Sequence, residues 1–133
     1  MSEAQTPAPA RVLIVDDEPR ILSALRRSLR REPYEVITVE SFREAYHVLE
    51  SQPVTLLLSD YKMPGMTGLH FLAEVARRHP AVVRLLITGW MESIPQQEID
   101  PVGVWAVIDK PWDDAELKDT LRGALKAGPP VPA

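Results

Sequence analysis

Five apolar runs alternate with helical patterns along this chain of 133 residues, and the alternation constrains the fold more than any other feature. The first run, at 12–15, is too continuous for a half-exposed strand and is typical of one buried on both faces. The other four runs lie at 36–39, 54–58, 82–87 and 104–108. This pattern predicts an α/β fold, in which a five-stranded parallel sheet with right-handed crossovers carries helices on both faces.

The segments between the runs carry helix start and stop signals. Ser41 with Glu44 forms a capping-box pattern, which predicts the start of a helix. Pro95 and Pro101 bracket only residues 96–100, between the fourth and fifth runs. Because proline disrupts a helix interior, the fourth helix is predicted to be short or distorted.

Length and composition indicate one packed domain. Apolar residues make up 45% of the chain, which is enough for a core, but 133 residues are too few for two sizeable cores. Residues 1–10 hold prolines and small or polar residues and are predicted to be a disordered lead-in. The folded domain is predicted to span 11–127, and 128–133 to be a stiff proline-rich tail or the stub of a linker.

Three absences narrow the function. The chain has no cysteine, which excludes disulfides and thiolate metal sites and leads us to expect a cytoplasmic protein. The net charge of -4 gives no electrostatic case for binding nucleic acid or an anionic membrane. No run approaches the roughly 18 apolar residues that a membrane-spanning helix needs.

Polar residues stand where the apolar runs stop. Asp16 and Asp17 follow the first run, and Asp60, Thr88 and Lys110 follow the third, fourth and fifth. Because parallel strands point the same way, we expect these side chains at one edge of the sheet, where ligands bind in such folds. Three carboxylates, a hydroxyl and an ammonium suit a divalent cation and a phosphoryl group.

Each of these signals has an ordinary alternative when it is taken alone. Asp16 and Asp17 could supply one direct and one water-mediated metal ligand, or could favour the first turn of the next helix. Asp60 could attack phosphorus as a nucleophile, or could hydrogen-bond the turn that follows it. Thr88 could be a plain strand end, and Lys110 a solvated cation. Their occurrence together, in one order, favours the reactive site.

Four motifs resemble the receiver domain of bacterial two-component response regulators: VLIVDDEP at 12–19, LLLSDYKMPGMTGL at 56–69, LLITG at 85–89 and DKPW at 109–112. The resemblance covers about residues 11–127 and implies the flavodoxin-like strand order 2-1-3-4-5. It also implies a bound Mg²⁺. Asp60 is the implied phosphoacceptor and also a ligand of this metal. Asp17 is implied as a direct ligand, Asp16 as a water-mediated ligand, and the backbone carbonyl of Lys62 as a further ligand.

The resemblance extends to switching, with one departure. Thr88 corresponds to the switch hydroxyl, and Lys110 to the lysine that supports the acceptor. Receivers usually carry Tyr or Phe three residues before that lysine, where this chain has Val107. Trp105 lies two residues earlier and is expected on the same strand face, so it could partly replace the aromatic residue; the alternative is a muted switch. Trp90 is expected to slow hydrolysis of the acyl phosphate.

The resemblance implies a signalling module rather than a turnover enzyme. A histidine kinase or phosphotransfer protein would phosphorylate Asp60, and the change would reach a downstream target or a fused output domain. Two alternatives stay open. One is a receiver-like interaction module that works without phosphorylation. The other is an aspartate-based phosphohydrolase, although such enzymes usually carry a second aspartate where this chain has Lys62.

Overall fold

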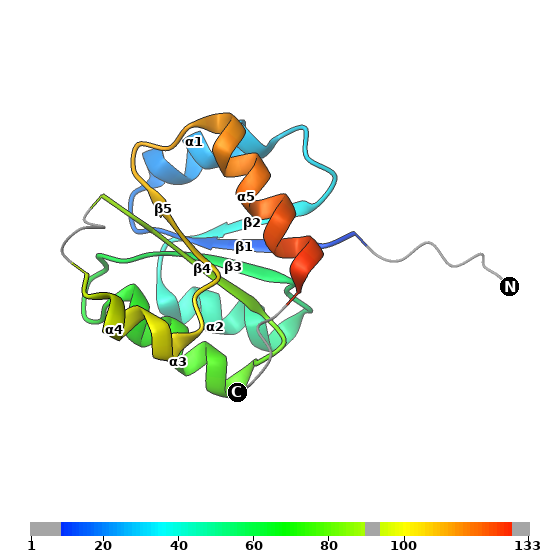
Figure 1. The fold of residues 1–133 in the computed structure, drawn as a ribbon. Coiled ribbons are helices and arrows are strands. Elements are labelled where there is room, and N and C mark those ends of the chain that lie inside the picture. The colour runs from blue at the N-terminus through cyan, green and yellow to red at the C-terminus, as the bar shows by residue number, and fades with distance from the viewer. Residues whose placement is uncertain (1–8, 90–93, 129–133) are drawn as a thin grey trace, which may run out of the picture.

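The computed structural model describes residues 9–89 and 94–128, and these form a parallel sheet with helices on both faces (Figure 1). Its strands are β1 Arg11–Val15, β2 Glu35–Val39, β3 Leu56–Asp60, β4 Val83–Thr88 and β5 Ala106–Asp109. Within the described part of the chain, all the strand pairs are parallel and the strand order is β2-β1-β3-β4-β5. The predicted fold class and strand order are confirmed.

The helices divide between the two faces of the sheet (Figure 1). One face carries α1 Pro19–Leu29 and α5 Asp114–Ala127, and the other carries α2 Phe42–Ser51, α3 Gly68–Arg78 and α4 Gln96–Ile99. The fourth helix is short, as predicted: α4 has four residues and continues into the 3-10 helix η2, Asp100–Val102. None of the helices in the described ranges has the length and apolar character needed to cross a bilayer.

Some sequence predictions fall outside the described residues, which leave out 1–8, 90–93 and 129–133. The disordered lead-in, most of the proline-rich tail and the role of Trp90 therefore stay predictions.

Two apolar clusters form the core, one on each face of the sheet. Val12 and Ile14 of β1 belong to the cluster that α1 and α5 cover, whereas Leu13 and Val15 belong to the cluster that α2 and α3 cover. All four side chains are fully buried. A strand with helices on both of its faces has no polar side to present, which explains the uninterrupted apolar run in the sequence.

The predicted capping box at the start of α2 is present. Ser41 Oγ accepts a hydrogen bond from the backbone N–H of Glu44 at 3.1 Å. In return, the Glu44 carboxylate accepts from the backbone N–H of Glu40 at 2.8 Å. The first bond satisfies an N–H group that a helix start leaves without a partner, and the second ties down the residue before the N-cap.

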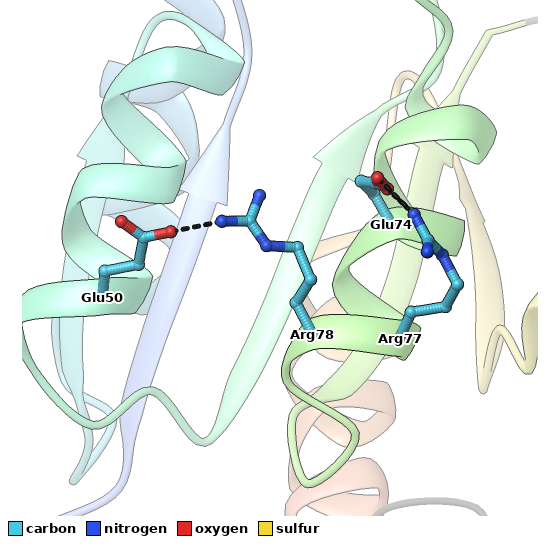
Figure 2. A network of polar contacts seen from close by, with 4 residues as sticks. All are labelled: Glu50, Glu74, Arg77 and Arg78. Carbon is cyan, nitrogen blue, oxygen red and sulfur yellow. Dashed lines mark hydrogen bonds and ion pairs between the residues drawn. The ribbon is translucent and has the colours of Figure 1, made fainter.

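Exposed ion pairs lie on the surface of α2 and α3. Figure 2 shows Arg78 of α3 reaching Glu50 of α2 and Arg77 pairing with Glu74 within α3. The distance from Arg78 Nη2 to Glu50 Oε2 is 2.7 Å. Pairs with this much solvent exposure contribute about 0–1 kcal/mol each. The fold therefore depends mainly on the two apolar clusters.

Candidate functional site

An open cleft of about 580 Å³ lies at the carboxyl ends of the strands. The residues that line it are Asp17, Glu18, Asp60, Lys62, Met63, Pro64, Gly89 and Lys110. They come from the carboxyl end of β3 and from the segments that follow β1, β3, β4 and β5, as the parallel topology predicts.

Two acidic residues leave β1 in different environments. Asp16 is fully buried, and its backbone N–H donates to the carbonyl of Val39 at 3.2 Å. Its Oδ1 accepts from the backbone N–H of Glu18 at 2.9 Å, which fixes the turn into α1. Asp17 is exposed and faces the cleft. The carboxylate of Asp16 is therefore buried and held by hydrogen bonds, whereas that of Asp17 meets solvent.

Asp60 and Lys110 form the centre of the site. Asp60 is the last residue of β3 and is 5% exposed. Lys110 follows β5 and places its Nζ 3.1 Å from Asp60 Oδ1 and 2.8 Å from Asp16 Oδ2. One ammonium thus contacts two buried carboxylates whose residues are far apart in the sequence.

The charges in the cleft do not balance. Burial raises the pKa of Asp60, the charge of Asp16 raises it further, and Lys110 acts in the opposite direction. Burial alone would lower the pKa of Lys110, but its hydrogen bond to Asp16 and the charge of Asp60 outweigh burial and raise it. Lys110 therefore remains an ammonium, and the acidic cluster still carries an excess of negative charge.

This acidic cluster fits a metal ion. Carboxylate oxygens of Asp16, Asp17 and Asp60 lie within 4.8 Å of one another. Hard carboxylate oxygens are the ligands that Mg²⁺ prefers, and a divalent cation would offset the excess negative charge. Lys62, at the cleft wall, pairs its backbone with Thr67 in an isolated bridge, which orders the loop after β3.

Thr88 ends β4 next to the cleft. It is 1% exposed, and its backbone carbonyl accepts from the N–H of Lys110 at 3.1 Å. The next residue, Gly89, lines the cleft. The structure therefore brings Asp16, Asp17, Asp60, Lys62 and Lys110 together around one cleft and places Thr88 at the adjacent strand end.

The two other switch candidates lie apart from each other. Val107 packs against the apolar cluster on the α4 side of the sheet. Trp105 precedes β5, is 39% exposed, and its ring tip lies so close to α5 that a Cβ on Gly123 would be 3.2 Å away. The expectation that Trp105 and Val107 lie on the same strand face is wrong, because Trp105 contacts α5 and Val107 packs on the opposite face. The alternation rule does not apply to Trp105, because it lies outside β5 at the edge of the sheet.

Sequence reasoning missed two residues that touch the backbone of Asp60. Ser59 Oγ donates to the Asp60 carbonyl at 3.0 Å. Gly68, the first residue of α3, lies against the same carbonyl. A glycine at a helix start has no distinctive sequence pattern, so only the packing of α3 against β3 reveals this contact.

The comparisons with known proteins agree with this geometry. The sequence model of the response regulator receiver domain matches residues 12–122. The hydrogenase transcriptional regulatory protein HoxA of Cupriavidus necator is 44% identical over 119 residues, which cover 89% of this chain and 24% of that protein. The transcriptional regulatory protein GlrR of Escherichia coli is 34% identical over 124 residues, which cover 92% of this chain and 28% of that protein. The chain thus spans about a quarter of the length of these relatives.

A solved structure shows the same fold. The response regulator TrrA of Thermotoga maritima, in complex with Mg²⁺-BeF, matches with a TM-score of 0.77 at 28% identity, over 86% of this chain and 98% of that chain. The sheet order and the helices around it define a flavodoxin-like α/β protein. Within that class, the chain belongs to the response regulator receiver domain family of two-component signalling.

Proposed function

We propose that this domain accepts a phosphoryl group on Asp60 from a histidine kinase or a phosphotransfer protein. The observation that supports this role best is the placement of Asp60 Oδ1 at 3.1 Å from Lys110 Nζ, in the lining of an open cleft. The carboxylate is buried yet reachable from the cleft that it lines. A partner can therefore present a phosphoryl group to it directly.

The phosphoryl transfer needs only the donor phosphohistidine and the carboxylate of Asp60 as reacting groups. An oxygen of Asp60 attacks phosphorus, the phosphorus–nitrogen bond of the donor phosphohistidine breaks, and its electron pair stays on the imidazole nitrogen. The product is an acyl phosphate on Asp60. Lys110 keeps its proton and places its positive charge beside the oxygen that forms the new bond.

We place a Mg²⁺ ion among the carboxylates of Asp16, Asp17 and Asp60 and the backbone carbonyl of Lys62. Support comes from the 4.8 Å grouping of the three carboxylates and from their excess of negative charge. Such an ion would neutralise negative charge on the phosphoryl oxygens. Asp16 is held by Lys110 and by the N–H of Glu18, so its position does not depend on the metal.

We further propose that phosphorylation acts on a larger protein or partner through the segment that begins at Thr88. The two relatives are described as transcriptional regulatory proteins, and this chain matches about a quarter of each. A fused or separate output module that regulates transcription is the partner that these relatives favour. Thr88, Val107 and, from the α5 face of the sheet, Trp105 are the switch residues in this proposal.

Phosphate uptake from acetyl phosphate tests the proposal. The parent protein is expected to gain one phosphoryl group in the presence of Mg²⁺ and none in EDTA, as read by intact-mass spectrometry. Asp60→Asn is expected to gain none, whereas the matched control Asp119→Asn, at an exposed position of α5, is expected to behave as the parent. A parent that takes up no phosphate would favour the interaction module, and steady turnover of a phosphate ester would favour the phosphohydrolase.

A further inference from the structure

We infer that Gly68 is a positioning residue for the phosphoacceptor: its missing side chain lets the start of α3 lie directly on the peptide of Asp60. This inference rests on the proposed function, because it concerns the same site. It assigns to the first residue of α3 a role in fixing both Asp60 and the loop that carries Lys62.

The contact leaves no room for a side chain. A Cβ with ideal geometry on Gly68 would lie 2.2 Å from the carbonyl oxygen of Asp60 and 3.0 Å from its carbonyl carbon. It would also lie 3.0 Å from the Cα of Tyr61. All three atoms belong to the backbone, so no rotamer change can relieve the overlap. Either the Asp60 peptide or the start of α3 would have to move.

Neighbouring bonds restrict that movement. Ser59 Oγ holds the Asp60 carbonyl at 3.0 Å. The backbone N–H of Gly68 donates to the carbonyl of Tyr61 at 2.7 Å, and Thr67 bridges to Lys62. The loop after β3 is thus closed by the same turn of chain that touches Asp60. A shift of this turn would displace both the acceptor and the carbonyl of Lys62.

The requirement at Gly68 is for space and not for an unusual backbone conformation. Gly65, in the same loop, shows the other case: its φ is 84°, and a Cβ added there would meet no atom within 4 Å. Gly68 has no such positive φ. Alanine forms helices better than glycine, so helix propensity alone would favour Gly68→Ala. The contact with Asp60 predicts the opposite effect on the site.

The test compares Gly68→Ala with Thr67→Ala. Thr67 caps α3, since its side chain accepts from the N–H of His70 at 3.2 Å. Thr67→Ala therefore weakens the same helix start without adding an atom next to Asp60. Two properties are measured per folded molecule: the Mg²⁺ dissociation constant, from an NMR titration with Mg²⁺ alone, and the rate of phosphate uptake from acetyl phosphate. Urea unfolding gives the folded fraction.

Gly68→Ala is expected to weaken Mg²⁺ binding about tenfold and to slow phosphate uptake about tenfold or more, because displaced ligands and acceptors lose their alignment. Thr67→Ala is expected to lose stability but to stay within about twofold of the parent in both properties per folded molecule. Equal values for the two variants would overturn the inference and leave the proposed function intact.

Other outcomes are equally decisive. A parent that binds Mg²⁺ but takes up no phosphate would overturn the proposed function, while the Mg²⁺ affinities would still decide the role of Gly68. A parent that does neither would overturn both. If Gly68→Ala does not fold, Ser59→Ala replaces it, because loss of Oγ frees the Asp60 carbonyl without adding bulk. Mg²⁺ affinity in Ser59→Ala equal to that of the parent would then overturn the inference.

Discussion

Two ion-pair clusters join the ends of α1 to the β5–α5 part of the chain, and they differ in how their charges balance. Before α1, Lys110 contacts Asp16 and Asp60 in the cleft. After α1, Arg122 of α5 binds the carboxylate of Glu32 through two hydrogen bonds of 2.7 and 2.6 Å. Both clusters connect residues that are distant in sequence, so both tie α1 to the far end of the chain.

The two clusters differ in the number of carboxylates with which each cation forms ion pairs. Arg122 forms its two hydrogen bonds with the carboxylate of Glu32, and these bonds lower the pKa of Glu32 despite burial. Lys110 meets two buried carboxylates with Asp17 close by, and the pKa of Asp60 is raised. The first cluster therefore stabilises the fold by itself. The second keeps an excess of negative charge, which opposes folding but suits a site for a metal and a phosphoryl group.

The largest expected effect comes from removing the cation of the unbalanced cluster. Lys110→Met keeps the apolar stem but loses the charge beside Asp60, so phosphate uptake from acetyl phosphate is expected to fall about a hundredfold. The control Lys126→Met removes an exposed cation from the last turn of α5 and is expected to leave the rate unchanged. Uptake by Lys110→Met at a rate close to that of the parent would show that the ammonium does not assist the transfer.

A smaller effect is expected on stability when one acid of the same cluster is neutralised. In EDTA, Asp60→Asn removes repulsion from Asp16 and is expected to raise the free energy of unfolding by about 1 kcal/mol in urea titrations. Saturating Mg²⁺ is expected to stabilise the parent and to narrow this difference, because a ligand that binds only the folded state adds to its stability.

Asp119→Asn serves as the control for this measurement, since its exposed carboxylate is not part of the acidic cluster in the cleft. It is expected to match the parent with and without Mg²⁺. If Asp60→Asn proved less stable than the parent in EDTA, the contrast between the two clusters would be wrong, because the cleft would then be balanced without a metal.

The comparison also separates what the sequence can predict from what it cannot. The sheet is predictable because helices on both faces leave its strands uninterrupted and apolar. The ends of the strands are harder to predict, because the apolar runs stop at 58 and 87 whereas β3 and β4 continue to Asp60 and Thr88. Asp60 and Thr88 are buried at the edge of the sheet. In the sequence, a polar residue after an apolar run is instead typical of a loop.

The grouping of Asp16, Asp60 and Lys110 follows from topology alone, because parallel strands bring their carboxyl ends to one edge. The pair of Glu32 with Arg122 and the contact of Gly68 with Asp60 have no such rule. They depend on how a loop packs on a helix and how a helix start packs on a strand. Neither contact can be predicted from the spacing of apolar and polar residues along the sequence.

The smallest expected effect tests the balanced cluster through pH. The pKa of Glu32 is lowered from 4.5 in the folded state, so the unfolded chain binds more protons on acidification. The pair therefore stabilises the fold above about pH 4.5, and this contribution is lost as the pH falls through the lower folded pKa. Glu32→Gln is expected to be less stable than the parent at neutral pH, with a difference that disappears in acid. The loss should be modest, because Arg122 is 57% exposed.

Urea unfolding of the parent and Glu32→Gln across this pH range checks the expected convergence. Glu50→Gln is the matched control: it breaks the pair with Arg78 on the α2–α3 face (Figure 2), where both side chains are about half exposed. Its stability is expected to follow that of the parent at every pH. A difference between Glu32→Gln and the parent that stayed constant down to acid pH would mean that Glu32 acts through packing around its buried carboxylate rather than through charge. In that case the two clusters would differ in burial and not in charge balance.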